Sequence, residues 1–265
     1  MSVDELASVD GELLRAVDAV IPVTDDGFLR GDGIFEVLRV YDGQPFALHD
    51  HLARLEASAR NLRLELPVPA AALEAEIAKL LEARGGSSFD GCLRIAVTRG
   101  GRRVLLTEPV PATPDQARLC FVTYSPTRVL DGVKSLSYAA NMLAGRIARE
   151  RGFDEALLTT PHGRVLEAPT ASLFYVAADG ALCTPPLGEH ILASITRQLV
   201  VDTCGATERA VTVDELLRSD EAFLASTTRE VQPVAQVEDR RLEAPGDRTR
   251  EAARLLRDRI RAAVT

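Results

Sequence analysis

Side chains over residues 33–41 fall into two alternating series, as expected for a β-strand with two different faces. The two series are Ile34, Glu36, Leu38 and Val40, and Phe35, Val37, Arg39 and Tyr41. Asp42-Gly43 follows, and this dipeptide is typical of tight hairpin turns. The pattern therefore predicts a β-hairpin over residues 33–48.

Apolar side chains spaced by three and four residues predict helices after this hairpin. From about Asp50, this spacing joins Leu52, Leu55, Ala59 and Leu62. A second helix is expected over about 70–83, where Gly85-Gly86 ends it. The remaining expected elements are strands at 93–98 and 117–124, a helix at about 138–151, hairpin-like strand pairs at 154–167 and 171–184, a helix from about 194, and a C-terminal helix.

The order of these elements predicts an α+β protein in two parts. Strands and helices are interspersed without a regular βαβ period, and turns such as Asp179-Gly180 favour antiparallel pairing. Ser125-Pro126-Thr127 is the expected junction. We therefore predict a small N-terminal domain over 1–124 and a larger C-terminal domain over 125–265.

Composition excludes several classes of protein. The 265 residues are 46% hydrophobic and 26% charged, with a net charge of −8, which argues against a nucleic-acid or anionic-membrane binder. No apolar run has the length of a transmembrane helix, and the acidic start is unlike a signal peptide. The four cysteines are dispersed, as expected of buried thiols in a reducing cytoplasm rather than of a metal site.

The chain has only two lysines, Lys79 and Lys134, against 29 arginines. Arginine can fill most structural cationic roles, but it keeps its proton in proteins and cannot form an imine. Such a composition is expected to keep a lysine where a deprotonatable amine is needed. Lys79 has the pattern of a surface position on an amphipathic helix. Lys134, just before the helix at 138–151, is the candidate nucleophile.

An imine-forming lysine suggests pyridoxal phosphate, which also needs partners for its ring nitrogen and ring oxygen. Glu167 ends a hydrophobic strand, and its carboxylate could pair with the ring nitrogen. A surface glutamate at a strand end is the simpler alternative. Tyr138, four residues after Lys134, could reach the ring oxygen, although a core tyrosine would have the same pattern.

A phosphate site could be assembled from three further segments. Ser194-Ile195-Thr196 opens a helix, where free backbone N–H groups bind anions, although an ordinary N-cap explains the same residues. Ser226-Thr227-Thr228 ends a strand with three hydroxyl groups. Arg54 could pair with phosphate in a bidentate manner.

Taken in order, these segments resemble the class IV aminotransferases, which are pyridoxal-phosphate enzymes of fold type IV. The matching segments are Arg30–Glu36, His51–Leu55, Lys134–Asn141, Gly152–Ala156, Gly163–Glu167, Ser194–Arg197 and Ser226–Val234. The family contains branched-chain and D-amino acid aminotransferases, R-selective amine transaminases and aminodeoxychorismate lyases. The resemblance implies a two-domain α+β fold like that of D-amino acid aminotransferases, and a homodimer.

The resemblance also implies a role for each matching residue. Lys134 would hold the internal aldimine and shuttle the substrate proton, while Glu167 would pair with the ring nitrogen and Tyr138 with the ring oxygen. The phosphate would be held by Arg54, Ile195, Thr196, Thr227 and Thr228. The cofactor site would lie between the two domains.

The substrate pocket is expected to contain Phe35 and several basic residues. Arg94 lies where relatives place a carboxylate-binding residue, and Arg102 and Arg103 could bind a second carboxylate, or could belong to a solvated loop. We predict a transaminase that exchanges an amino group between an amino acid or amine and a 2-keto acid. An aminodeoxychorismate lyase is the alternative, and a non-catalytic α+β protein is a remote one.

Overall fold

The computed structural model describes residues 5–264, which form two compact units. The first unit contains the chain up to Pro111, the segment Gly132–Tyr138 and the chain from Ala262. The second contains Ala112–Asp131 and Ala139–Arg261. Both units combine helices and sheets, as predicted for an α+β protein. The predicted domain boundary after residue 124, with a cofactor site between the domains, stays a prediction.

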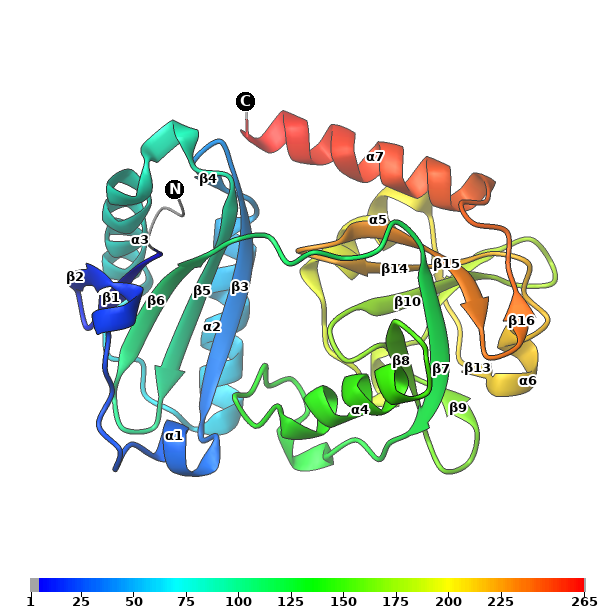
Figure 1. The fold of residues 1–265 in the computed structure, drawn as a ribbon, viewed down its shortest axis with the longest axis horizontal. Helices are drawn as coiled ribbons and strands as arrows, with labels where there is room; N and C mark the ends of the chain where they lie inside the picture. The colour runs from blue at the N-terminus through cyan, green and yellow to red at the C-terminus, as the bar shows by residue number, and fades with distance from the viewer. Residues whose placement is uncertain (1–4, 265) are drawn as a thin grey trace. The chain divides into compact units, whose positions relative to one another are not determined.

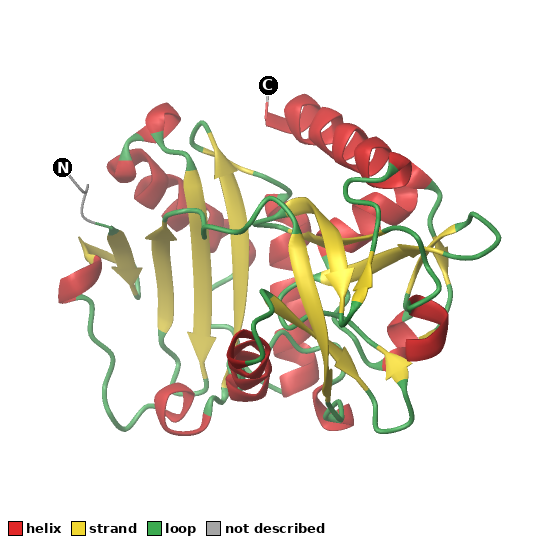
Figure 2. Ribbon diagram, turned by 45° about the vertical axis from the view of Figure 1, so that its right-hand side comes forward, coloured by secondary structure: helices red, strands yellow, loops and turns green. Residues whose placement is uncertain are grey.

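The first unit is an antiparallel sheet with two helices along one face (Figure 1). Its strands lie in the order β2-β1-β6-β5-β3-β4, and Figure 2 shows the long ones running side by side. The strands are β1 (Leu6–Val9), β2 (Glu12–Arg15), β3 (Gly33–Tyr41), β4 (Gln44–Pro45), β5 (Gly91–Thr98) and β6 (Arg103–Glu108). The helices are α1 (Asp26–Arg30), α2 (Leu48–Leu62) and α3 (Ala70–Arg84).

The alternation along β3 separates the two faces of this sheet. Ile34, Leu38 and Val40 are fully buried and belong to the core that α2 and α3 cover. The other series lies on the opposite face, which we call the open face and define by Phe35, Val37, Arg94, Leu106 and Glu108. The strand registers place these residues together, because Arg94 lies between Val37 and Leu106. The predicted hairpin is confirmed, with its turn at Asp42-Gly43.

The second unit contains a ten-stranded, curled sheet (Figure 2). Its main order is β12-β11-β10-β14-β15-β7-β8-β9-β13, and β16 pairs with β15. The strands are β7 (Ala117–Thr123), β8 (Glu155–Thr159), β9 (Arg164–Val165), β10 (Ser172–Val176), β11 (Leu182–Thr184), β12 (Thr207–Glu208), β13 (Val211–Thr212), β14 (Ala222–Ser226), β15 (Glu230–Val237) and β16 (Arg240–Arg241). The helices are α4 (Ala139–Glu150), α5 (Ile195–Cys204), α6 (Val213–Leu216) and α7 (Asp247–Val264).

The expectation of antiparallel pairing is wrong for two parts of this sheet, which are β7 with its neighbours and the β11–β12 pair. Strand β7 runs parallel to both β8 and β15. The chain leaves β7, crosses through α4 and returns in β8, so these elements form a βαβ crossover. Local hydrophobic spacing predicts each element but not its pairing partner, so it does not reveal this crossover. The hairpins predicted at 154–167 and 171–184 are confirmed.

The long helices reflect their apolar spacing closely. Helix α2 buries Leu52, Leu55 and Ala59, and α3 buries Leu73, Ile77, Leu80 and Leu81. Both begin and end within two residues of the predicted bounds. Over residues 5–264, no helix is long and apolar enough to cross a membrane.

Candidate active site

The segment that carries Lys134 is held against the start of β3 by an isolated antiparallel bridge. The Phe35 N–H donates to the Lys134 carbonyl at 2.9 Å, and the Leu136 N–H donates to the Gly33 carbonyl at 2.9 Å. Between these bonds, Ile34 and Ser135 form an antiparallel bridge. The backbone of Lys134 is therefore fixed by main-chain hydrogen bonds to a strand of the core sheet.

Two glycines make this close approach possible. Gly31 has a φ of 67°, and a Cβ there would lie 2.9 Å from the Ser137 Oγ. A Cβ on Gly33 would lie 2.6 Å from both the Leu136 Cδ1 and the Val97 carbonyl oxygen. The Gly-Asp-Gly sequence at 31–33 thus leaves room for the Lys134 segment.

Helix α2 holds the same segment from its other side. The Lys134 N–H donates to the Oγ of Ser58, a buried residue, at 3.1 Å, and the Asn61 side chain donates to the Gly132 carbonyl at 3.1 Å. Both helix residues lie in the last two turns of α2. Lys134 is therefore flanked by β3 and α2, which pack together in one core.

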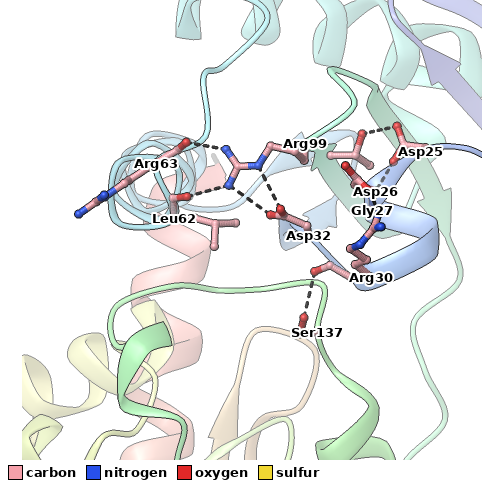
Figure 3. A network of polar contacts seen from close by, with 11 residues as sticks. Asp25, Asp26, Gly27, Arg30, Asp32, Leu62, Arg63, Arg99 and Ser137 are labelled. Atoms are coloured by element: carbon pink, nitrogen blue, oxygen red, sulfur yellow. Dashed lines mark hydrogen bonds and ion pairs between the residues drawn. The ribbon is translucent and has the colours of Figure 1, made fainter.

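Arg99 ties the end of α2 to the Gly-Asp-Gly loop (Figure 3). Its guanidinium donates to both Asp32 carboxylate oxygens, at 3.1 and 3.2 Å. It also donates to the carbonyls of Leu62 and Arg63, at 2.8 and 2.5 Å, and so caps the helix C-terminus. In the same network, the Ser137 Oγ donates to the Gly31 carbonyl at 3.0 Å. Polar contacts thus reinforce the geometry around Lys134.

The Lys134 amine lies against the ring of Phe35. Its Nζ is 4.4 Å from the ring centroid, within the range of a cation–π contact. Tyr138 meets the same ring edge-on, with centroids 5.4 Å apart, and the Arg94 guanidinium carbon is 5.7 Å from the Phe35 centroid. Four predicted site residues are therefore brought together on the open face: Phe35, Arg94, Lys134 and Tyr138.

Arg54, a fifth predicted site residue in this unit, is paired with a buried carboxylate. Its Nε and Nη2 donate to the two Glu36 oxygens at 2.8 and 2.6 Å, and the His51 Nδ1 is 2.8 Å from Glu36 Oε2. Burial would raise the pKa of Glu36, but hydrogen bonds from Arg54 and His51 outweigh it and lower this pKa to about 2. Arg54 is therefore held in place by an ionised, fully buried carboxylate.

Burial also lowers the pKa of His51, and the positive charges of Arg54 and Lys134 lower it further. The Glu36 carboxylate opposes both effects. A lowered pKa keeps His51 neutral at pH 7.

Glu36, His51 and Ser58 were not among the predicted site residues. A signal existed for Glu36, which is the one charged residue in the buried series of β3. A carboxylate at such a position requires a partner.

Arg102 and Arg103, predicted to bind substrate, both contact carboxylates of the first unit. Arg102 donates to Asp10 at 2.6 Å. Arg103 is buried, and its Nε donates to Glu76 of α3 at 2.6 Å. The Arg103 contact braces β6 against α3. The substrate role of both residues stays a prediction.

In the second unit, Glu167 lies two residues beyond β9 and is half-buried. Its Oε1 accepts a hydrogen bond from the Leu192 N–H at 3.0 Å. Burial raises the pKa of Tyr124, and the charge of Glu167 adds to this rise. Leu192 and Tyr124 are far from Glu167 in the chain, so local sequence patterns do not indicate them as its neighbours.

The predicted phosphate-binding residues of this unit lie at a helix start and in a hairpin turn. Ser194 caps α5 by accepting from the Arg197 N–H, and Ile195 and Thr196 form the first turn, where N–H groups lack acceptors within the helix. Thr227 and Thr228 lie in the turn between β14 and β15. Beside them, the buried Ser226 Oγ has no hydrogen-bond partner among the described residues. Hydroxyl and N–H donors, one of them buried and unsatisfied, suit a phosphate group.

Comparison with known proteins decides the family. Residues 33–237 match the family described as amino-transferase class IV. The chain belongs to this family. The match covers most of the chain and includes all the segments that hold Lys134, Glu167 and the helix start at Ser194.

Individual relatives of this class IV aminotransferase differ in reaction. It is 33% identical to a putative branched-chain-amino-acid aminotransferase of Methanocaldococcus jannaschii over 88% of each chain. It is 32% identical to a D-alanine aminotransferase of Bacillus licheniformis over 95% of each.

Two solved structures share its fold. A fold IV-transaminase of Curtobacterium pusillum is 28% identical, with a TM-score of 0.83, over 95% of this chain and 98% of that one. A 4-amino-4-deoxychorismate lyase of Pseudomonas aeruginosa is 31% identical, also with a TM-score of 0.83, over 96% and 98%. The predicted enzyme class, fold type and cofactor, pyridoxal phosphate, are confirmed.

Proposed function

We propose that this enzyme transfers an amino group between an amino acid or amine and a 2-keto acid, with pyridoxal phosphate attached to Lys134. The observation that carries the proposal is the setting of the Lys134 amine. It lies against the Phe35 ring, which Tyr138 and Arg94 also approach, on a segment fixed by β3 and α2. Lys79, by contrast, is exposed on α3.

The cofactor, when bound, supplies an electron sink for the substrate carbon. Lys134 would attach it and then move the proton at the substrate Cα. Tyr138 would donate to the ring oxygen, and Glu167 would hold a proton on the ring nitrogen. The phosphate would be held by Arg54, Ile195, Thr196, Thr227 and Thr228. The Glu36 carboxylate would keep the Arg54 guanidinium oriented for this task.

Substrate carboxylates would be bound by Arg94, with Arg102 and Arg103 as further candidates. The position of Arg94 on the open face, 5.7 Å from the ring that also contacts Lys134, supports its role. An α-amino acid carries its carboxylate one bond from the reacting carbon. A guanidinium that shares the Phe35 ring with the amine is therefore suited to orient it.

Absorption spectroscopy of the purified holoenzyme tests the proposal. Wild-type protein with pyridoxal phosphate should show a visible absorption band that bleaches with a suitable amino donor and returns with a 2-keto acid. D-alanine, L-leucine and an R-amine would be compared as donors. A band that ignores every donor would contradict transamination.

The 31% identity to the P. aeruginosa structure supports a second candidate, an aminodeoxychorismate lyase. This reaction would use the same lysine but would release pyruvate from a ring substrate with two carboxylates. Incubation with aminodeoxychorismate separates the candidates, because formation of 4-aminobenzoate and pyruvate without an amino acceptor is expected only of the lyase.

Substitution of Glu167 by glutamine should lower turnover while covalent attachment at Lys134 persists. A hydrogen bond to a charged partner contributes about 1.5–3 kcal/mol, so we expect a roughly tenfold to hundredfold loss of kcat. Steady-state assays would measure kcat, and borohydride trapping would show that attachment at Lys134 persists. Unchanged kcat in Glu167→Gln would remove the ring-nitrogen role from this residue.

We also propose that the enzyme is a homodimer, as its family resemblance implies. The stretch between β2 and β3 exposes several apolar side chains, with Val20 77% and Val23 74% exposed. Phe28 and Leu29 of α1 are exposed as well. Such a concentration of exposed apolar residues is typical of an interaction surface.

A double substitution, Val20→Asp with Val23→Asp, should shift a dimer toward monomer at micromolar concentration, because it places charge in an apolar contact. Light scattering coupled to size exclusion would measure the mass. The control is Val129→Asp, since Val129 is exposed to a similar degree outside this stretch. A double variant that keeps the dimer mass would exclude the stretch from the interface.

A further inference from the structure

A carboxylate lies directly beside the predicted substrate arginine on the open face. The Arg94 Nε donates to the Glu108 Oε2 at 2.9 Å. Both side chains are partly exposed, Arg94 to 39% and Glu108 to 29%. Glu108 is the last residue of β6 and pairs with Cys92, two residues before Arg94. The two side chains are therefore diagonal neighbours on adjacent strands.

Arg94 thus has two close neighbours, the Glu108 carboxylate and the Phe35 ring. That ring also contacts the Lys134 amine, so the guanidinium and the amine share one aromatic neighbour. When a substrate carboxylate approaches Arg94, the Nε of the guanidinium is already bonded to Glu108. The substrate carboxylate would also experience repulsion from the Glu108 charge.

We infer that Glu108 is a specificity-determining residue that limits the attraction of Arg94 for substrate carboxylates. Its pairing with Arg94 lowers the local positive charge and leaves the guanidinium held at Nε. The preference of the enzyme for amino acids over carboxylate-free amines is then smaller than it would be if Arg94 had no carboxylate partner. The inference rests on the proposed function, because it assigns Arg94 to the substrate.

Two variants separate the charge of Glu108 from its orienting contact. Glu108→Gln keeps an oxygen that can accept from Nε but removes the charge, and Glu108→Asp keeps the charge on a shorter side chain. Removing a like charge a few ångströms from the substrate carboxylate should lower the KM for pyruvate and 2-oxoglutarate roughly threefold to thirtyfold. The KM for a carboxylate-free R-amine should not fall, and Glu108→Asp should stay near the wild type.

Succinate provides a readout that needs no turnover, because it carries carboxylates but no reacting group. Calorimetric titration of the holoenzyme should show tighter succinate binding in Glu108→Gln by a similar factor. Asp90→Asn is the matched control, since it removes a carboxylate that pairs with a different arginine of the same sheet, Arg39. It should leave succinate binding unchanged.

The inference is overturned if Glu108→Gln lowers the KM for the amine as much as for the keto acids, if it leaves succinate binding unchanged, or if Glu108→Asp behaves like Glu108→Gln. If the wild-type enzyme accepted an amino group from none of the donors, the proposed function would instead be wrong. Succinate titration would still report on Glu108 and Arg94 in that case, so the two failures remain distinguishable.

Discussion

Replacement of Lys134 by alanine is expected to abolish covalent attachment of pyridoxal phosphate and to lower kcat at least roughly a thousandfold. The same amine would attach the cofactor and move the proton at the substrate Cα, so one substitution removes both steps. Borohydride treatment followed by peptide mass spectrometry would detect attachment in the wild type and its loss in the variant. Steady-state assays would give kcat.

The second lysine supplies a matched control. Lys79 is exposed on α3, and Lys79→Ala should retain both attachment and turnover. With only two lysines in the chain, the pair of variants accounts for every lysine amine. Turnover by Lys134→Ala at near wild-type rates, or cofactor fixed to Lys79, would refute the assignment.

Substitution of Glu36 by glutamine is expected to lower the free energy of unfolding by about 3 kcal/mol at pH 7. The change leaves the Arg54 guanidinium, paired at 2.6 and 2.8 Å in the wild type, without its anionic partner. If Arg54 binds the phosphate as proposed, cofactor affinity should fall as well, since Arg54 would lose the carboxylate that holds its guanidinium in place. Urea unfolding and fluorescence titration with pyridoxal phosphate would measure these two effects.

The loss of stability in Glu36→Gln should depend on pH in a defined direction. The pKa of Glu36 falls from 4.5 to about 2 in the folded protein. Its stabilisation is therefore complete above about pH 4.5 and is lost as the pH falls toward 2. The difference in free energy of unfolding between the wild type and Glu36→Gln should become smaller as the pH falls over this range. Glu65→Gln, at an exposed position after α2, should change stability little at any pH, and an equal loss in both variants would argue against the buried pair.

The candidate nucleophile could be predicted because its surroundings in the sequence are unusual. In a chain that uses arginine almost everywhere, one lysine before a helix and four residues from a tyrosine already indicates imine chemistry. The confirmed family and cofactor agree with that indication. The roles of Lys134, Glu167 and the phosphate-binding residues stay predictions.

The supporting contacts could not be predicted, because they join residues far apart in the chain. Lys134 donates its N–H to Ser58, which lies 76 positions away. Arg103 lies in a basic loop by sequence, yet its guanidinium is buried against Glu76. Spacing reveals which face of an element is apolar, but not which element will cover it.

Strand pairing could be predicted only where a short turn joins the two strands. The hairpin that contains β3 and β4 has a local turn signal at Asp42-Gly43, and it was predicted correctly. Strands β7 and β8 are joined through α4, so no turn marks their parallel pairing. Short strands such as β1 and β2 carry too few residues for a clear alternation.

The close approach of the Lys134 segment to Gly31 and Gly33 has a consequence for mutational tolerance. In a library that samples every substitution, these two positions should be as depleted as the lysine itself, although neither offers a functional group. Gly188, where a Cβ would meet nothing within 4 Å, should accept alanine. Intolerance at a residue of this enzyme can therefore report the space that the neighbouring Lys134 segment occupies.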